Sequence, residues 1–302
     1  MGKTTNFPDG LTSQGVPVLG SGLAGLDPSG SFYFCDGNSG SDSNDGKSWK
    51  TAKKTLANVF ALSHSDIARG ADRWARRNTI FCAGDSFAED LLILPQKTDV
   101  VGVGSYNGHR GPNLLGNHAP VNAGLGCRFL NFNFEPVTAG TIMTLVASVW
   151  GFQAVNCRFK ASGTLVAVKA IDMTACPHTK ILGCLFLGAF TGDVIDIGAG
   201  AVDEVEIRGN QILGGANDGI VVTGATTLTA GRKAIIADNF IEVAGKVIVD
   251  GDDDTIMVAG NRCVSAGANT GAAYEIDEGL AVDNVITYND GTSVRVPIIP
   301  SA

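Results

Sequence analysis

Short apolar runs separated by Gly, Asn and Asp recur along most of this chain at a nearly constant spacing. One local pattern has a small or turn-forming residue, then Asn or Cys, then an apolar residue two places on. It is centred on six positions: Cys157, Cys184, Asn210, Asn239, Asn261 and Asn284. Successive centres are 27, 26, 29, 22 and 23 residues apart. A repeat of this length, built from strands and turns, predicts a solenoid in which each repeat forms one turn.

A second set of β-branched runs repeats with almost the same period. Taking Ile171, Ile197, Val222, Val249 and Ile276 as equivalent residues gives steps of 26, 25, 27 and 27. The runs are short and bounded by Gly, Asn and Asp, which supply the turns between strands. No long helix fits between them, which excludes βαβ units. The two sets together predict a parallel β-helix.

The Asn and Cys column follows from this geometry. Equivalent positions in a solenoid stack about 4.8 Å apart from turn to turn. An inward-facing Asn can donate and accept hydrogen bonds along such a stack. We therefore expect Asn210, Asn239 and Asn261 to form a structural ladder rather than a ligand array. Cys157 and Cys184 are expected to fill the same column as small apolar groups.

The chain divides into four segments. Residues 1–30 are rich in Gly, Pro and Ser without periodicity, which predicts an extended N-terminal arm. Residues 31–105 are expected to form an N-terminal cap and the first turns, with strands at 32–35, 79–82 and 91–94 and a capping helix at about 52–69. Residues 106–290 are the repeat region. Residues 291–302 are a terminal strand and tail, in which the prolines prevent further pairing.

Composition narrows the class of protein. The 302 residues include 40 Gly, with 44% hydrophobic and 17% charged residues, which is enough for one large core. The formal net charge of −8 argues against a nucleic-acid partner. No apolar run reaches the roughly 18 residues of a membrane span. The first residues lack the apolar segment of a secretory signal, which disfavours a secreted polysaccharide lyase.

The cysteines and histidines predict neither disulfides nor a metal site. The seven cysteines are an odd number without a CxxC pair, and most lie in apolar strand patterns. We expect them to be reduced and buried, as in a protein that folds in a bacterial cytoplasm. The four histidines (His64, His109, His118 and His178) lack metal-ligand spacing. No metal or other cofactor is therefore predicted.

The N-terminal part resembles the pectate-lyase-like β-helix superfamily. The resemblance rests on the loop Asp36-Gly37-Asn38 to Asn44-Asp45-Gly46 with Trp49 and Thr51 after it, on the segment at 80–90, and on the strand at 99–104. With the repeats it covers about residues 31–290. It implies an all-β fold, a single-stranded right-handed parallel β-helix. That fold hosts lyases, hydrolases, tailspikes and inert structural parts, so it implies no single function.

Two acidic segments are candidate sites. The loop from Asp36 to Asp45 has oxygen ligands at alternating positions, as calcium prefers, but it lacks the terminal Glu of an EF-hand loop. Polar turns explain this loop equally well. The run Asp250-Gly251-Asp252-Asp253-Asp254 is the densest carboxylate cluster, and a glycosidase needs two carboxylates. Its position in a turn favours a solvated loop, and we expect no catalytic residues.

The N-terminal arm carries the functional expectation. Residues 5–18 resemble the start of small virion proteins of tailed bacteriophages, and such an arm can fold on binding and wrap a surface. The resemblance implies a non-enzymatic structural protein of the virion, a capsid decoration or head-fibre protein. The expected anchors are Phe7, Leu11, Val16, Val18 and Leu19. The major capsid protein is the preferred partner, with tail proteins as the other candidate, and a homotrimer is expected by analogy with related β-helices.

The alternative is a tailspike-type protein that binds or depolymerises a surface polysaccharide. Aromatic residues make up only 7% of the chain, and the three Trp are spread at 49, 74 and 150. Little sequence follows residue 290. These features favour the structural role, and recognition of a surface glycan stays open.

Overall fold

The computed structural model describes the solenoid and parts of the segments around it. The described residues are 12–13, 16–17, 30–69, 76–84, 86–104, 111–121, 124–147, 149–161, 167–198, 204–222, 234–250, 256–265, 281–282, 284–288 and 293–296. Of the predicted arm, only Thr12–Ser13 (β1) and Val16–Pro17 (β2) are described, and these two strands pair antiparallel. The extended form of the arm stays a prediction.

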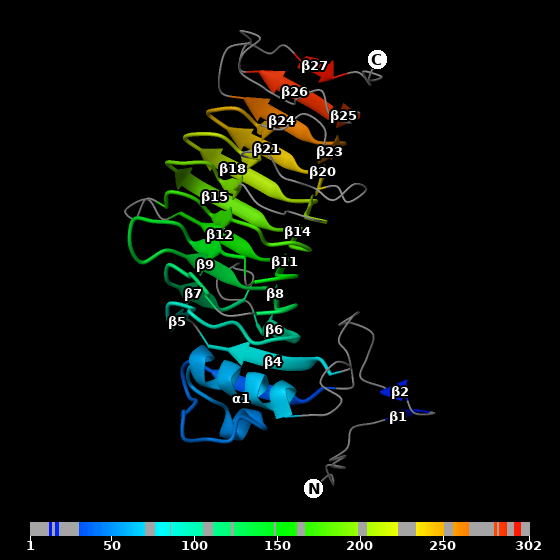
Figure 1. The fold of residues 1–302 in the computed structure, drawn as a ribbon. Helices are drawn as coiled ribbons and strands as arrows, with labels where there is room; N and C mark the ends of the chain where they lie inside the picture. The colour runs from blue at the N-terminus through cyan, green and yellow to red at the C-terminus, as the bar shows by residue number, and fades with distance from the viewer. Residues whose placement is uncertain are drawn as a thin grey trace, which may run out of the picture.

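The main body is an elongated solenoid of short parallel strands (Figure 1). The strands fall into three sheets, and each pairs with the equivalent strand of the next turn. Five turns contribute to the third sheet as well as to the first two. This architecture confirms the predicted parallel β-solenoid. The right-handed winding and the superfamily stay predictions.

The bounds of the strands are as follows. Sheet 1 contains β3 (Phe32–Asp36), β4 (Asn78–Ala83), β6 (Thr98–Gly102), β8 (Arg128–Leu130), β11 (Gln153–Val155), β14 (Lys180–Leu182), β17 (Glu206–Arg208), β20 (Ala234–Ala237), β23 (Ile256–Ala259) and β25 (Ala281–Val282). Sheet 2 contains β5 (Ser86–Ala88), β7 (Asn113–Leu115), β9 (Asn133–Glu135), β12 (Arg158–Lys160), β15 (Leu185–Phe190), β18 (Gln211–Gly215), β21 (Phe240–Val243), β24 (Arg262–Ser265), β26 (Asn284–Tyr288) and β27 (Ser293–Val296). Sheet 3 contains β10 (Met143–Leu145), β13 (Ile171–Met173), β16 (Ile195–Ile197), β19 (Ile220–Val222) and β22 (Ile248–Asp250). The terminal strand β27 pairs antiparallel with β26.

The register of sheet 2 confirms the first repeat. The residues paired from turn to turn are Arg158, Leu185, Gln211, Phe240, Arg262 and Val285. Each of them directly follows one of the six predicted repeat centres. The Asn and Cys column therefore lies at the bend that enters sheet 2.

The alignment predicted for the second repeat was wrong at two positions. Ile171 pairs with Ile195 rather than Ile197. Val249 is equivalent to Val221 rather than Val222, and Ile276 lies outside the described residues. Ile195 and Ile197 both face the core on either side of the outward Asp196, and β19 is apolar at all three of its positions. Apolar character alone therefore does not decide whether Ile195 or Ile197 lies opposite Ile171, because a shift of two residues keeps every side chain on the same face.

The predicted Asn ladder is present. The Oδ1 atom of Asn239 accepts hydrogen bonds from the backbone N–H and the Nδ2 of Asn210, both at 3.0 Å. Asn261 accepts the equivalent pair from Asn239, at 3.0 and 2.9 Å. Each amide also donates to the carbonyl of an inward residue of sheet 1: Ile181, Ile207 and Ile236. All three Asn are almost completely buried, so the ladder satisfies backbone groups that would otherwise be buried without a partner.

The cysteines of this column do more than fill space. The Cys157 thiol donates to the carbonyl of Phe129 at 3.5 Å, and the Cys184 thiol donates to that of Ala154 at 3.4 Å. These carbonyls are in register with those that the Asn amides bind. The column therefore supplies a hydrogen-bond donor at each turn, which corrects the view of Cys157 and Cys184 as purely apolar groups. All seven cysteines are free and buried, as predicted.

The core contains a stack of rings inside sheet 2. Phe134, Phe159 and Phe186 are paired residues of successive turns, with centroids 4.8 and 5.0 Å apart and nearly parallel planes. Parallel stacking at the turn spacing follows from the register. Ile212, Ile241 and Cys263 continue the same inward row.

Helix α1 (Leu56–Arg69) lies at the N-terminal end of the solenoid (Figure 1). It starts four residues later than predicted, because Lys53 pairs with Cys35 of β3 and the N–H groups of Lys54 and Thr55 bind Asp42. A short 3₁₀ helix (η2, Trp49–Thr51) precedes these residues. Its buried face packs against β3 and β4. Phe60 on that face meets Phe129 edge to face, with centroids 6.2 Å apart. The helix is therefore joined to the same apolar core as the strands.

Residues 91–94, predicted as a strand, form no strand. Leu91 and Leu94 are buried, whereas Leu92 and Ile93 are 57% and 55% exposed. This in–out–out–in order differs from the alternation of a strand. The segment connects β5 with β6 alongside α1, and two of its apolar side chains are left on the surface.

Candidate functional site

Most of the predicted site residues lie outside the described residues. This holds for Phe7, Leu11, Val18 and Leu19 of the arm, whereas Val16 belongs to β2, of which only the backbone pairing is described. Residues 251–254 of the acidic run also lie outside, and Asp250 is the last residue of β22. The anchoring role of the arm and the role of this acidic run stay predictions.

The Asp-rich loop uses its carboxylates to bind backbone groups. The Oδ1 atom of Asp42 accepts from the N–H groups of Lys54 and Thr55, at 3.1 and 3.0 Å. Burial opposes ionisation of Asp42, but the hydrogen bonds from Thr55 and Lys54 outweigh it and lower its pKa. Asp36 and Asp45 accept backbone hydrogen bonds in the same way. Local turn chemistry therefore explains the loop. Nowhere in the described part of the chain do three or more His, Cys, Asp or Glu form a group suited to a metal ion.

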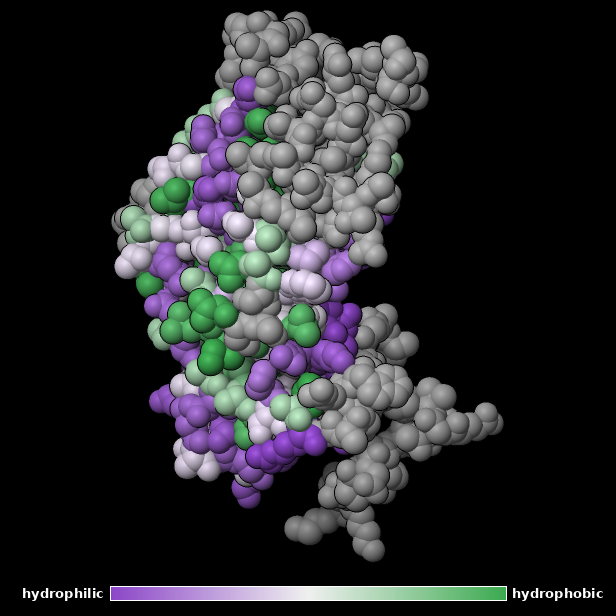
Figure 2. Space-filling view, viewed as in Figure 1, coloured by the Kyte–Doolittle hydropathy of each residue, from purple (hydrophilic) through white to green (hydrophobic). Residues whose placement is uncertain are grey.

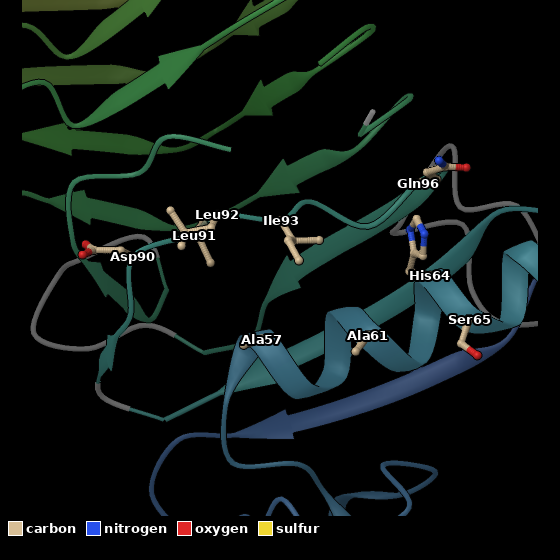
Figure 3. Close-up of a pocket in the computed structure, with 9 residues that line it drawn as sticks. All are labelled: Ala57, Ala61, His64, Ser65, Asp90, Leu91, Leu92, Ile93 and Gln96. Atoms are coloured by element: carbon tan, nitrogen blue, oxygen red, sulfur yellow. The ribbon is translucent and has the colours of Figure 1, made fainter. Parts of the chain in front are cut away.

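An apolar depression lies between helix α1 and the segment from Asp90 to Gln96 (Figure 3). Its volume is about 720 Å³. Ala57 and Ala61 form the helical wall, and Leu92 and Ile93 form the opposite wall. We call this feature the α1 groove. It exists because the two alanines are too short to reach the leucine and isoleucine across it.

Two carboxylates hold the walls of the α1 groove in place. Both oxygens of Glu89 accept hydrogen bonds at the start of α1, from the N–H of Leu56 at 2.8 Å and from that of Ala57 at 2.9 Å. A carboxylate is favourable there because the first N–H groups of a helix lack partners within the helix. The neighbouring Asp90 accepts from the N–H of Asn117 at 2.9 Å. The segment that carries Leu92 and Ile93 is thus fixed to both the helix and the next turn.

The apolar surface extends beyond the groove. Val121, which is 71% exposed, donates its backbone N–H to the carbonyl of Leu92 at 3.1 Å. Figure 2 shows apolar side chains gathered in one patch of this face, over the turns next to α1. Polar groups flank the groove: Asp90 lies at one end, and His64 and Gln96 lie at the other (Figure 3). An apolar surface with polar edges is typical of a site that binds another molecule.

A second feature is an acidic group on the outer side of sheet 3. Lys169 forms ion pairs with Asp196 and, at 3.7 Å, with Asp172. Burial lowers the pKa of Lys169, but the hydrogen bond with Asp196 and the charges of the acidic group outweigh it and raise that pKa. Asp193, which accepts a 2.6 Å hydrogen bond from Asn217, has a pKa above its ordinary value.

Burial is the main cause of the raised pKa of Asp193, and the charges of Asp218 and Asp196 add to it. A carboxyl group that resists ionisation beside ionised neighbours is the arrangement found in acid–base pairs, although buried ion-pair networks produce it too. These acidic residues were not predicted as site residues. A signal was present, since Asp172 and Asp196 are 24 residues apart and Asp193 and Asp218 are 25 apart, close to the repeat period.

Comparisons with known proteins identify no relative. No protein-family model, no curated protein and no solved structure matches this chain. Within the part of the chain that the structure describes, no helix has the length and apolar character to cross a membrane.

Proposed function

We propose that this chain is a non-enzymatic structural protein of a tailed-phage virion, a capsid decoration or head-fibre protein. In this proposal residues 1–30 attach it to the major capsid protein or, as the other candidate, to a tail protein. The solenoid then projects from that attachment point. The protein is assembled in the cytoplasm of the bacterial host and resides in the particle.

The exposed apolar surface beside α1 is the observation that supports attachment at this end. Leu92, Ile93 and Val121 are all more than half exposed. The arm joins the fold at β3, and α1 packs against that same strand. An arm and an apolar surface at one end of a rod suit fastening to a larger assembly, because both can bury apolar area against one partner. The continuous strand pairing from turn to turn and the buried Asn ladder suit a rod that keeps its shape.

Particle incorporation tests the proposal. Phage particles would be produced with the full chain, with residues 2–30 deleted, and with Leu92→Glu combined with Ile93→Glu. Trp150→Glu, at a side chain that is 51% exposed in a later turn, is the matched control. We expect the deletion to abolish incorporation, the double variant to reduce it and the control to match wild type. Incorporation of the deletion variant at the wild-type level would refute the attachment role.

The acidic group on sheet 3 favours a second candidate function, a tailspike-type polysaccharide-binding or depolymerising protein. Glycoside hydrolysis uses one carboxyl group that stays protonated and another that is ionised. Asp193, whose pKa is raised by burial and by the charges of Asp218 and Asp196, belongs to a group of carboxyl side chains of the kind that this reaction uses. The test is release of reducing ends from the surface polysaccharide of the host. Activity that disappears in Asp193→Asn but persists in Asp238→Asn, at an exposed turn, would support this candidate. Inactivity of the wild-type protein would reject depolymerisation.

A further inference from the structure

A row of apolar side chains runs along the outer face of sheet 1. Register places six residues in one line, one per turn: Phe34, Phe81, Val101, Leu130, Val155 and Leu182. The residues between them, such as Phe129 and Ala154, face the core. We call this line the sheet 1 row. Its members are partly exposed except Val101, which is 7% exposed.

The row differs from the outer face of sheet 3. There the equivalent residues of successive turns include Thr144, Asp172 and Asp196. A sheet with one face in water usually shows polar residues on that face. Six consecutive apolar positions on sheet 1 therefore need another explanation. The line of six apolar residues is not recognisable in the sequence, because each residue belongs to a different turn.

Aromatic groups enlarge the row at its N-terminal end. Trp49 is 44% exposed and meets Phe34 edge to face, with centroids 5.0 Å apart. Phe34 and Phe81 are 5.8 Å apart. Together with Val101 and Val103 these rings line a shallow depression of about 440 Å³. Aromatic side chains dominate the energetics of protein interfaces and are enriched there.

The charges of this face balance each other, unlike those of the whole chain. The outward positions of the sheet 1 strands carry three acidic and three basic residues, which are Asp36, Asp99, Glu206, Arg128, Lys180 and Arg208. Asp99 binds Arg128 at 2.5 Å, and Lys180 binds Glu206 at 2.8 Å. The chain as a whole has a formal net charge of −8. Sheet 1 is thus a face on which two copies meet without the repulsion that their net charge creates elsewhere.

From these observations we infer that copies of this chain associate side by side through the sheet 1 row. A partner that packs along the whole row must present a straight line of side chains with the same spacing from turn to turn. A second copy of this chain has that spacing, because its sheet 1 is the same. The copies run parallel, because only then does each turn meet its own equivalent, however unequal the turns are in length. This surface is independent of the attachment role of the arm and of the α1 groove.

Disulfide crosslinking tests the arrangement, because all seven native cysteines are buried and give little background. Leu130→Cys and Leu182→Cys place a thiol in the middle and at the far end of the row. Thr144→Cys, on the outer face of sheet 3, is the control. Under mild oxidation we expect disulfide-linked dimers from both row variants and none from the control. If the Leu130→Cys variant forms disulfide-linked dimers and the Leu182→Cys variant does not, the parallel arrangement is wrong. If the Thr144→Cys control forms dimers equally well, the assignment to sheet 1 is wrong.

Sedimentation of the full chain gives an independent result. We expect a mass that is a multiple of 31.1 kDa, and the homotrimer expected from the resemblance to related β-helices is one such multiple. Val155→Glu introduces a charge in the row and should shift the mass to that of one chain, whereas Thr144→Glu should leave it unchanged. Circular dichroism checks that both variants stay folded. A wild-type protein that sediments as a single chain at micromolar concentration would refute the inference.

Discussion

Asn239 in the middle of the ladder offers the sharpest test of how this solenoid is held together. Its side chain takes part in four buried hydrogen bonds, two accepted from Asn210 and one donated to each of Ile207 and Asn261. Asn239→Ala removes all four. The N–H of Asn210 then has no acceptor, while the Nδ2 of Asn210 keeps its bond to Ile181.

The expected cost follows from these contacts. A buried donor left without a partner costs about 1–3 kcal/mol, and each other lost hydrogen bond costs about 1 kcal/mol. We therefore expect Asn239→Ala to lower the free energy of unfolding by about 4–6 kcal/mol. That is a large share of the roughly 5–15 kcal/mol that stabilises a typical domain.

A second substitution separates the donor from the acceptor function. Asn239→Cys introduces the residue that the same column has at Cys184, whose thiol donates to the equivalent carbonyl. It retains a donor for Ile207 but still leaves the N–H of Asn210 without an acceptor. We expect it to lower the free energy of unfolding by about 3–5 kcal/mol, which is about 1 kcal/mol less than the loss in the alanine variant.

Guanidinium unfolding followed by circular dichroism measures these differences. The control is Asn58→Ala on the exposed side of α1, where the amide binds only the nearby Thr55, and a change within about 0.5 kcal/mol is expected. If Asn239→Ala unfolds within about 0.5 kcal/mol of wild type, the ladder contributes little. If the Cys variant is as unstable as the Ala variant, the donor to Ile207 is unimportant.

Three other predictions concern pH and the walls of the α1 groove. Burial lowers the pKa of His118 from 6.5 to about 4, against a smaller opposing effect of Asp90. As the pH falls, His118 is therefore protonated in the unfolded chain before it is protonated in the folded chain. The contribution of His118 to the free energy of unfolding should therefore fall by about 3 kcal/mol between pH 6.5 and about 4 and then level off. Urea titrations at several pH values measure this fall, and the same fall in His118→Gln would contradict the prediction. The raised pKa of Asp193 means that stability declines as pH rises above its unfolded value of about 3.9. Asp193→Asn should thus raise the melting temperature at pH 7 and give no gain at pH 3, whereas no gain at pH 7 would count against the raised pKa. Glu89→Ala removes the carboxylate at the start of α1 and should cost about 1–2 kcal/mol in denaturant titration. Glu135→Ala, which breaks a 3.5 Å ion pair with Lys160, is the control and should cost less than about 1 kcal/mol; equal losses would argue against the capping role.

Parts of the candidate sites were within reach of sequence analysis and parts were not. Asp172 and Asp196 are separated by nearly one repeat, so their stacking follows once the solenoid is assumed. The α1 groove is different, because Ala57 and Leu92 lie on opposite walls that are joined by the hydrogen bonds of Glu89 to the start of the helix. Nothing in the spacing of these residues indicates that they line one groove. The exposure of Leu92 and Ile93 was missed because an apolar run was taken for a strand.

Local residue patterns were sufficient to predict the period of the solenoid, the column of Asn and Cys at one bend and the burial of the seven cysteines. These follow from local chemistry that repeats in every turn, since a stacked fold needs the same turn residue and the same buried donor each time. The register of sheet 3 became clear only from the folded chain, because Ile195 and Ile197 both face the core and either could lie opposite Ile171. The tertiary structure also decided the α1 groove and the sheet 1 row. Each of these surfaces joins residues from different turns, so its character depends on which side chains face outward together.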